Sequence, residues 1–322
     1  MEVNIQSKPF SFQLIKKLKT SQGFLKFRRG FLLRLETSSG QSGWGEVSPF
    51  QPNELRECKE LLTLIGKKTS RSNLESQISQ LPGSLAFGIG AALAEIDHFN
   101  GGKAKGNWLK APRSAVLLPD PEKLLDVIHS TISKSQKEDY APTFKWKVGI
   151  RSNSEEQELL NEILSCLPSN AKLRLDANGA WNRKTAYQWV NSLINQPSVE
   201  WLEQPLPTLD IEGLLKLSQK IPIALDESLT TDKSLIKSWK SWQVRRPILE
   251  GDPRKLLQEL EARSSHKMLS TSFETGIGQR WVHHLSALQQ QGPTPTAPGL
   301  AEDWFPDNDL FSSNPITVWE AA

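Results

Sequence analysis

The chain has 322 residues, and its 39 lysines and arginines nearly balance 36 aspartates and glutamates, for a net charge of +3. Because this small excess comes without a clustered basic run, it does not indicate a nucleic-acid partner. No stretch reaches the roughly 18 uninterrupted apolar residues that span a bilayer, so we expect no membrane partner. Cys58 and Cys166 lie far apart, outside any C-x-x-C pattern, as is typical of free thiols in the cytoplasm. Glu2, Asn4 and Gln6 interrupt the first apolar positions, unlike a signal peptide.

The first part of the chain has the pattern of a small α+β domain. Residues 1–50 alternate apolar and polar side chains with a period of two, which predicts an antiparallel sheet. The turn at 38–40 separates two of these runs as in a β-hairpin. Helical patterns follow over 53–66 and 84–98, and the small residues of the second indicate close packing. We predict an α+β capping domain over residues 1–111.

Beyond Pro112 the pattern changes to alternating strands and helices. The apolar run 114–118 is followed by Asp120-Pro121, which predicts a helix capped by the aspartate. Six or more such units favour a closed barrel over an open sheet. The predicted fold class is therefore α/β, a (β/α)7β TIM-like barrel over residues 112–300, with segment 301–322 returning to the capping domain. The other predicted strands are 143–148, 172–176, 199–203, 221–226, 243–248 and 267–272, and the predicted helices between them include 154–167, 183–193, 211–219 and 253–261.

Three acidic residues follow three successive predicted strands. Asp176 ends L-R-L-D, Glu203 ends E-W-L-E and Asp226 ends I-A-L-D, at spacings close to one strand-plus-helix unit. For any one of them, a helix cap is as good an explanation as a metal ligand. Three carboxylates on one rim of a barrel, however, repel one another unless a cation lies between them. Oxygen ligands of this kind predict Mg²⁺, with Mn²⁺ as a substitute, rather than zinc.

Two lysines share one face of the predicted strand 143–148, because side chains at i and i+2 point the same way. A K-x-K pattern alone is typical of a solvated edge strand, but a strand inside a barrel has no exposed edge, so these lysines need an anionic partner. A metal beside a lysine favours removal of a proton next to a carboxylate, since the metal stabilises the resulting charge. Lys147 is the predicted base, with its pKa lowered by nearby positive charge. Lys145 is predicted to tune Lys147 and to contact the carboxylate of a small-molecule substrate.

The segments K-x-K, L-D-A-N, E-Q-P and D-E-S resemble the enolase superfamily, in particular its muconate-lactonizing subgroup. Four further segments narrow the resemblance to the o-succinylbenzoate synthase family: G-W-G-E-V-S-P, L-A-F-G-I-G-A-A-L, A-V-L-L-P and S-T-S-F-E-T-G-I-G. The resemblance implies a dehydratase that converts 2-succinyl-6-hydroxy-2,4-cyclohexadiene-1-carboxylate to 2-succinylbenzoate in menaquinone and phylloquinone biosynthesis.

The resemblance also implies roles for individual residues. It makes Asp176, Glu203 and Asp226 the ligands of Mg²⁺ and Lys147 the base that removes the proton. It further implies that the strand end Ser270-Thr271-Ser272 and the loop Gly276–Gly278 receive the succinyl carboxylate of the substrate. A plain strand followed by a glycine turn also explains this segment, so its role stays open. The residues implied to lie around the metal and the substrate are Arg174, Asn178, Ser270, Thr271, Ser272 and Gly276.

The chain departs from the family pattern at Arg246, where relatives have a lysine before proline. Arginine stays protonated, so Arg246 cannot be a second acid or base, and a racemase, which needs a base on each face of its substrate, is disfavoured. A dehydration with one base remains, and Arg246 is predicted to lie as a cation over the substrate ring. Two alternatives stay open. One is another enzyme of the subgroup (an N-acylamino-acid or dipeptide racemase or epimerase, or a cycloisomerase), and the other is a metal-binding barrel without turnover.

Overall fold

The computed structural model describes residues 1–20, 23–98 and 108–322, and the chain forms two compact units. The cap unit contains residues 1–112, 245–265 and 269–322, and the sheet-helix unit contains residues 113–244 and 266–268. The domain boundaries predicted from the sequence, after residue 111 and after residue 300, stay predictions. Among the described residues, no helix combines the length and the hydropathy that crossing a bilayer requires.

The cap unit is built on an antiparallel sheet in which the strands have the order β3-β2-β1-β4. The period-two pattern of the sequence is confirmed, because Val3 pairs with Thr37 and Phe31 pairs with Val47. The register between the two long strands shifts once, between Gln13 and Leu18. The hairpin predicted at 38–40 joins the second and third strands. The strands are β1 (Glu2–Thr20), β2 (Gly23–Thr37), β3 (Ser42–Val47) and β4 (Lys68–Ser70).

A helix rich in small residues packs tightly on this sheet, as its sequence predicts. An added Cβ at Gly43 would lie 1.9 Å from the carbonyl oxygen of Ala92, and one at Gly45 would lie 1.9 Å from that of Gly88. The backbones of β3 and of this helix therefore approach more closely than any side chain allows. The helices of this region are α1 (Pro52–Ile65), α2 (Arg71–Gln77), α3 (Gly83–Ile96) and the short 3-10 helix η1 (Ile78–Gln80).

The C-terminal segment packs on the same sheet. Leu310 and Val318 lie in one apolar cluster with Phe10 and Phe12. The remaining helices of the cap unit are α10 (Pro247–Glu250), α11 (Pro253–Glu261), α12 (Gly276–Gln290), η2 (Glu302–Trp304), η3 (Asp309–Phe311) and α13 (Pro315–Ala321). Residues 276–278, which the sequence predicts as a glycine loop, instead form the first turn of α12, capped by the Thr275 side chain.

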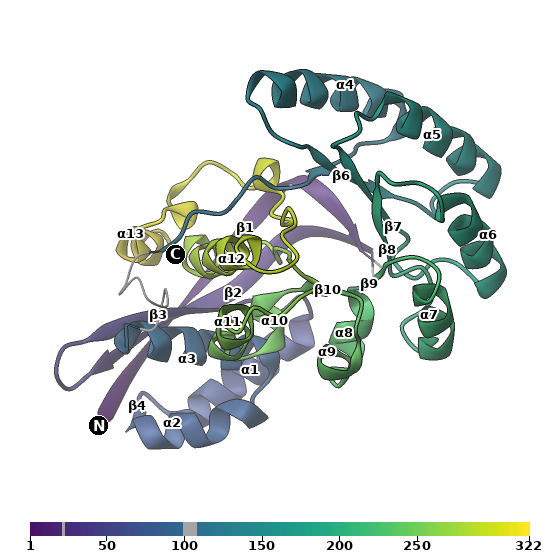
Figure 1. The fold of residues 1–322 in the computed structure, drawn as a ribbon. Helices are drawn as coiled ribbons and strands as arrows, with labels where there is room; N and C mark the ends of the chain where they lie inside the picture. Colours follow the sequence, from purple (N-terminus) through teal and green to yellow (C-terminus); the bar gives the residue numbers. More distant parts are fainter. Residues whose placement is uncertain (21–22, 99–107) are drawn as a thin grey trace. The chain divides into compact units, whose positions relative to one another are not determined.

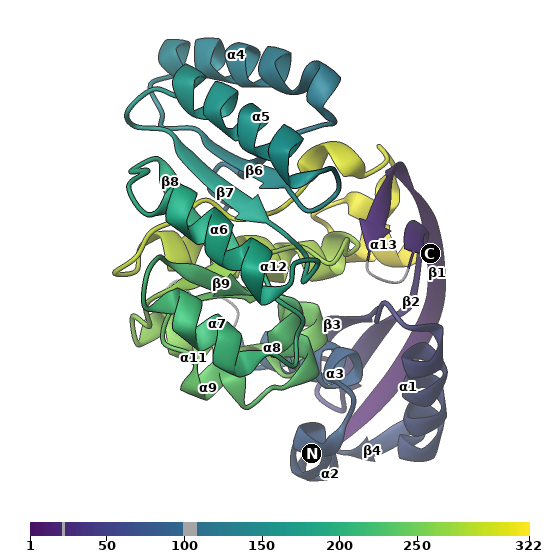
Figure 2. The same ribbon diagram turned by 90° about the vertical axis from the view of Figure 1, so that its right-hand side faces the viewer.

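The other unit contains the predicted alternation of strands and helices. Its parallel sheet has the strand order β11-β10-β9-β8-β7-β6-β5, and α4 to α7 lie along one side of β6 to β8 (Figures 1 and 2). The strands are β5 (Val116–Leu117), β6 (Thr143–Lys147), β7 (Lys172–Asp176), β8 (Val199–Glu203), β9 (Ile223–Leu225), β10 (Trp242–Arg245) and β11 (Lys267–Leu269). The helices are α4 (Pro121–Lys137), α5 (Asn153–Cys166), α6 (Arg183–Leu193), α7 (Ile211–Ser218), α8 (Glu227–Thr231) and α9 (Leu235–Ser238).

The last three strands are shorter than predicted. β9 ends before Asp226 because that residue is the N-cap of α8, and β10 ends before Pro247, which begins α10. Helix α4 begins at Pro121 as predicted, but the side chain of Asp120 accepts no capping hydrogen bond.

Alternate residues of the parallel strands face two different environments. Phe144, Trp146 and Leu175 lie in the large core between the sheet and its helices. Trp201 and Val244 belong to a separate, smaller cluster on the opposite face. Trp146 therefore points away from the face that Lys145 and Lys147 share, as the period of a strand predicts.

Substitution of Gly45 by alanine should lower the free energy of unfolding by about 3 kcal/mol, because the new methyl group overlaps the Gly88 carbonyl. Urea unfolding of the purified protein measures this change. Ser42→Ala, at an exposed position of the same strand, is the control and should have little effect. Equal stability of the two variants would contradict the close approach of β3 and α3.

Candidate active site

Strand register brings the predicted catalytic residues of the sheet-helix unit to one level. Lys147 pairs with Asp176, and Asp176 pairs with Glu203, across the three adjacent strands β6, β7 and β8. Asp226 directly follows β9, whose Ala224 pairs with Glu203. The carboxyl ends of four neighbouring strands therefore present one lysine and three carboxylates together, as the strand-helix spacing in the sequence predicts.

The ammonium group of Lys145 lies between two of the carboxylates. Its Nζ is 2.8 Å from Oδ2 of Asp176 and donates a hydrogen bond of 2.7 Å to Oε1 of Glu203. Both acids are almost completely buried, with side-chain exposures of 2% and 0%, so this ion pair is shielded from water. Lys147, in contrast, forms no hydrogen bond or ion pair within the described residues 1–20, 23–98 and 108–322.

A fourth acid, Glu227, belongs to the same cluster, and the sequence analysis missed it. Its Oε1 accepts a 2.9 Å hydrogen bond from Nδ2 of Asn178, while its Oε2 is buried and has no partner within the described chain. Asn178 also donates its backbone N–H to Oδ1 of Asp176 at 3.0 Å. Asn178 has a φ of 46°, a left-handed conformation that asparagine tolerates better than most residues. The signal in the sequence was the acidic residue next to Asp226, which suggests only a helix cap.

The pKa values of the buried acids are shifted in a way that indicates an excess of negative charge in the cluster. Burial, and then the charge of Asp176, raise the pKa of Glu203 to about 7. Burial, and then the charges of Asp226 and Asp176, raise the pKa of Glu227 to about 8. Burial also disfavours charge on Asp176, but the ammonium groups of Lys145 and Lys147 outweigh it and lower that pKa. One bound ammonium therefore does not neutralise the whole cluster.

The pKa of Lys145 lies above its ordinary value. Burial alone would lower this pKa, but the charges of Asp176, Glu203 and Asp226 outweigh burial and raise it. Lys145 therefore remains a cation at neutral pH and is unsuited to accept a proton.

The donor set fits a hard divalent cation, which prefers carboxylate oxygens. The raised pKa values of Glu203 and Glu227, and the partnerless buried Oε2 of Glu227, also favour a cation of higher charge. Among the residues that the structure describes, however, no three Asp, Glu, His or Cys side chains have the geometry of a bound metal. Lys145 occupies the space beside Asp176 and Glu203, so these side chains would have to rearrange around an ion.

Arg174 supports the carboxylates from within the sheet. Its side chain is fully buried, its Nε donates to Oε2 of Glu200 at 2.7 Å, and its guanidinium lies 4.1 Å from the ring centroid of Trp201. Trp201 in turn donates its Nε1–H to Oε2 of Glu203 at 3.4 Å. Arg174 therefore contacts Trp201, which contacts Glu203, and its role near the metal and the substrate stays a prediction.

The other predicted site residues belong to the cap unit. Arg246 donates from its guanidinium to the carbonyl oxygen of Thr271 at 2.5 Å, and Thr271 lines a cavity of about 190 Å³. Ser270 donates its backbone N–H to the carbonyl oxygen of Arg245 at 2.9 Å. The Oγ of Ser272 is buried and has no partner within the described residues. The joint role of these residues with the carboxylate cluster stays a prediction.

Acidic side chains of the cap unit already use the backbone donors of the segment 271–278. Glu274 accepts from the N–H of Ser272 at 2.6 Å. Glu46 accepts from the N–H groups of Thr275 and Gly278 at 2.9 and 3.1 Å. At Gly276 an added Cβ would lie 2.0 Å from the carbonyl oxygen of Ser312, so this glycine is packed against backbone. These contacts do not favour the predicted binding of a substrate carboxylate at Gly276.

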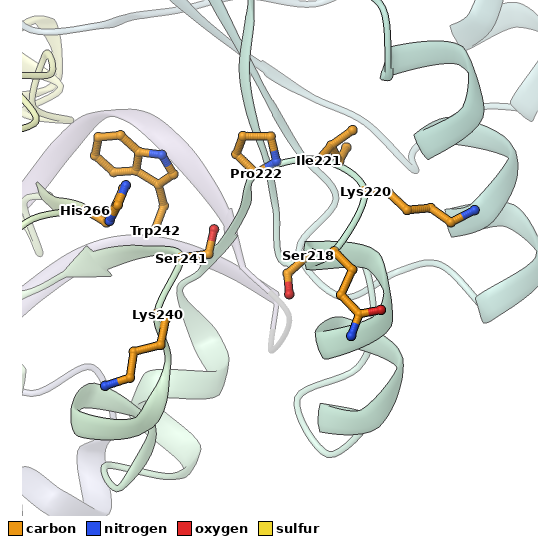
Figure 3. A pocket seen from close by; sticks show the side chains of 9 residues that line it. Ser218, Lys220, Ile221, Pro222, Lys240, Ser241, Trp242 and His266 are labelled. Atoms are coloured by element: carbon orange, nitrogen blue, oxygen red, sulfur yellow. The ribbon is translucent and has the colours of Figure 1, made fainter.

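A larger cavity of about 480 Å³ lies at the opposite ends of the strands (Figure 3). Its lining residues precede or begin β9, β10 and β11, whereas the carboxylates end or follow their strands. Its two lysines are engaged elsewhere, since Lys220 lies over the ring of Tyr187 and Lys240 donates to the carbonyl of Lys237. We therefore do not assign the reaction to this cavity.

Comparisons with known proteins agree with this geometry. A family described as "Enolase C-terminal domain-like" matches residues 129–239. The chain is 32% identical to an o-succinylbenzoate synthase of Thermosynechococcus vestitus, over 84% of this chain and 85% of that protein. It is 26% identical to an o-succinylbenzoate synthase of Haemophilus influenzae, over 90% and 87% of the two chains.

Solved structures agree as well. The crystal structure of o-succinylbenzoate synthase from Thermosynechococcus elongatus, complexed with Mg in the active site, matches with a TM-score of 0.81 and 29% identity. The match covers 99% of this chain and 100% of that chain. A dipeptide epimerase from Enterococcus faecalis, complexed with Mg and a dipeptide, has a TM-score of 0.71 at 22% identity over 92% and 93% of the two chains, which shows likeness of fold only.

The parallel strand-helix sheet, the antiparallel capping sheet and the acids at the strand ends define an enzyme of the enolase superfamily. The predicted α/β fold class, a barrel with a capping domain, is thereby confirmed. Within that superfamily, the chain belongs to the o-succinylbenzoate synthase family. The predicted class of enzyme, a hydro-lyase, is confirmed with it.

Replacing Lys145 with methionine should lower the free energy of unfolding by about 3 kcal/mol at neutral pH without divalent ions, because two buried carboxylates lose their cation. Chemical denaturation measures this loss. Lys172→Met, at an exposed position of β7, is the control and should change stability little. A Lys145→Met variant as stable as the control would argue against the buried ion pair.

Proposed function

We propose that the chain removes water from 2-succinyl-6-hydroxy-2,4-cyclohexadiene-1-carboxylate to give 2-succinylbenzoate, a step of menaquinone or phylloquinone biosynthesis. The observation that supports this most is Lys147, a lysine without a partner in the described chain, in strand register with Asp176 and Glu203. The likeness to o-succinylbenzoate synthases over most of the chain supports the same reaction. A cytoplasmic location stays a prediction from the free cysteines.

The substrate loses a proton from the carbon beside its carboxylate. Nζ of neutral Lys147 accepts that proton as the C–H bond breaks. The C–O bond to the ring hydroxyl then breaks, and the departing hydroxyl takes the proton back from Lys147 and leaves as water. The electron pair of the C–H bond forms the third double bond of the ring, and the pair of the C–O bond leaves with the oxygen. The ring thereby becomes aromatic, which provides the driving force. One base on one face of the ring is sufficient for both transfers.

Negative charge develops on the substrate carboxylate while the proton leaves. Asp176, Glu203 and Asp226 would hold Mg²⁺, or Mn²⁺ in its place. The bound ion would act as a Lewis acid that stabilises this negative charge. Lys145 remains protonated between Asp176 and Glu203, so it limits repulsion among the acids and adds positive potential near Lys147.

Racemases and epimerases are the main alternative, because a dipeptide epimerase has a similar fold. Such enzymes remove a proton from one face and return it to the other, so they need two titratable bases. Position 246, where the family resemblance implies a second lysine, is an arginine in this chain, and a guanidinium stays protonated. The dehydration therefore remains the proposal.

Lys147→Ala should lower kcat roughly 1,000-fold or more, since it removes the only proposed base. Loss of the diene absorbance of the cyclohexadiene substrate measures the rate. Mg²⁺ binding should persist, because the carboxylates are unchanged, and Lys172→Ala serves as the exposed control. Substantial turnover by Lys147→Ala would rule out Lys147 as the base.

Removal of divalent ions with a chelator should abolish turnover, and added Mg²⁺ should restore it. Mn²⁺ should restore it in part, because it accepts the same oxygen ligands. Binding of Mg²⁺ should also raise the melting temperature of the wild-type protein, since a ligand of the native state stabilises that state. Full activity in the presence of excess chelator would contradict the metal site.

A further inference from the structure

Gln204 follows the metal-ligand candidate Glu203 and connects all three strand ends that present the acids. Its backbone N–H donates to the carbonyl oxygen of Ala224 at 2.8 Å, on the strand that precedes Asp226. Its own carbonyl oxygen accepts from the N–H of Gly179 at 2.7 Å, in the turn that follows Asp176. With a φ of 37°, Gln204 has a left-handed backbone, which ends β8 at Glu203.

The side chain of Gln204 makes a second set of contacts. Its Nε2 donates to the carbonyl oxygen of Leu206 at 2.9 Å and to Oγ of Ser228 at 2.7 Å. Its Oε1 accepts from the backbone N–H groups of Asp226 and Ser228 at 3.3 and 3.1 Å. Both amide protons and the amide oxygen are used, and the side chain is fully buried.

The partners leave one orientation for this amide. At these contacts Leu206 presents its carbonyl oxygen and Asp226 presents its backbone N–H. The nitrogen and oxygen of the amide therefore cannot exchange places without losing both bonds. Because the group is buried, any lost bond would leave a polar atom without a partner, which is costly. The amide therefore holds the first residues of α8 rigidly against the end of β8.

We infer that Gln204 is a positioning residue that sets the spacing of Asp176, Glu203 and Asp226 and thereby favours Mg²⁺. Mg²⁺ requires a nearly ideal octahedron of oxygen ligands, whereas Ca²⁺ accepts variable geometry and longer bonds. A fixed spacing of the acids consequently matters more for Mg²⁺ than for Ca²⁺. This inference rests on the proposed function, because it takes these three acids as the metal ligands.

Gln204→Met tests the inference, since methionine has a similar length and makes none of the four side-chain hydrogen bonds. A matched control is Gln243→Met, because Gln243 is another buried glutamine of the same sheet, 4% exposed, whose Nε2 donates to two backbone carbonyl oxygens, those of Ile236 and Trp239. Titration calorimetry with Mg²⁺ and with Ca²⁺ on the purified full chain gives the two affinities. Thermal melts of both variants without metal compare their stability.

We expect Gln204→Met to weaken Mg²⁺ binding roughly tenfold or more, and Ca²⁺ binding by less. Gln243→Met should lose comparable thermal stability and keep its Mg²⁺ affinity within about twofold of wild type. Equal losses of Mg²⁺ affinity in both variants, or an unchanged affinity in Gln204→Met, would overturn the inference and leave the proposed function in place. Absence of Mg²⁺ binding to the wild-type protein would overturn the inference together with the proposed function.

Ser228→Ala keeps the test decisive if Gln204→Met does not fold. It removes one acceptor of the Gln204 amide and leaves the other three side-chain bonds. We expect a loss of Mg²⁺ affinity of a few-fold, again larger than the loss for Ca²⁺. An unchanged ratio of the two affinities would count against the positioning role.

Discussion

Asp176, Glu203 and Asp226 repel one another, yet the register of the parallel strands holds them at one end of the sheet. Each side chain is buried, so water does not screen the repulsion. Burial first, and then the neighbouring carboxylates, raise the pKa values of Glu203 and Glu227. The ammonium of Lys145 offsets part of this charge through two contacts below 3 Å. The rest of the unit has to hold the acids in place against a force that would separate them.

The groups around the acids are buried and hydrogen-bonded, so they hold the acids in place. Trp201 donates its Nε1–H to the carboxylate of Glu203. The ring centroid of Trp201 lies 4.6 Å from that of Trp242 and 4.1 Å from the guanidinium of Arg174. Gln204 connects the ends of three strands through its backbone and its amide. A cation that binds here would therefore meet strand ends whose backbone is already ordered, while the side chains of Lys145, Asp176 and Glu203 rearrange around it.

The cap unit solves a similar problem with its own buried charges. Arg28 is 1% exposed, stacks on Phe50 and donates to the carbonyl oxygens of Ser48 and Pro49. The buried acid Glu46 accepts from the first turn of α12, where a helix N-terminus favours negative charge. The segment G-W-G-E-V-S-P therefore has an internal structural role, in addition to its value as a sign of the family.

The sequence by itself determined the order and type of most elements, and it determined which residues share a strand face. Period-two and strand-helix patterns are local properties, so helices such as Arg183–Leu193 and strands such as Lys172–Asp176 were predictable to the residue. The grouping of Lys147, Asp176, Glu203 and Asp226 was also predictable, because parallel strands joined by helices bring their carboxyl ends to one edge.

The tertiary structure alone decided the contacts among these groups. Pairing of Lys145 with two acids, the inclusion of Glu227, and the stacking of Arg174 on Trp201 all depend on side-chain packing between residues far apart in the chain. The same holds for residues 270–278, where sequence suggested an open glycine loop and Glu46, 229 residues from Thr275, uses the backbone donors instead. Hydrogen bonds over such separations leave no periodic trace in a sequence, because they are satisfied only once the fold brings the partners together.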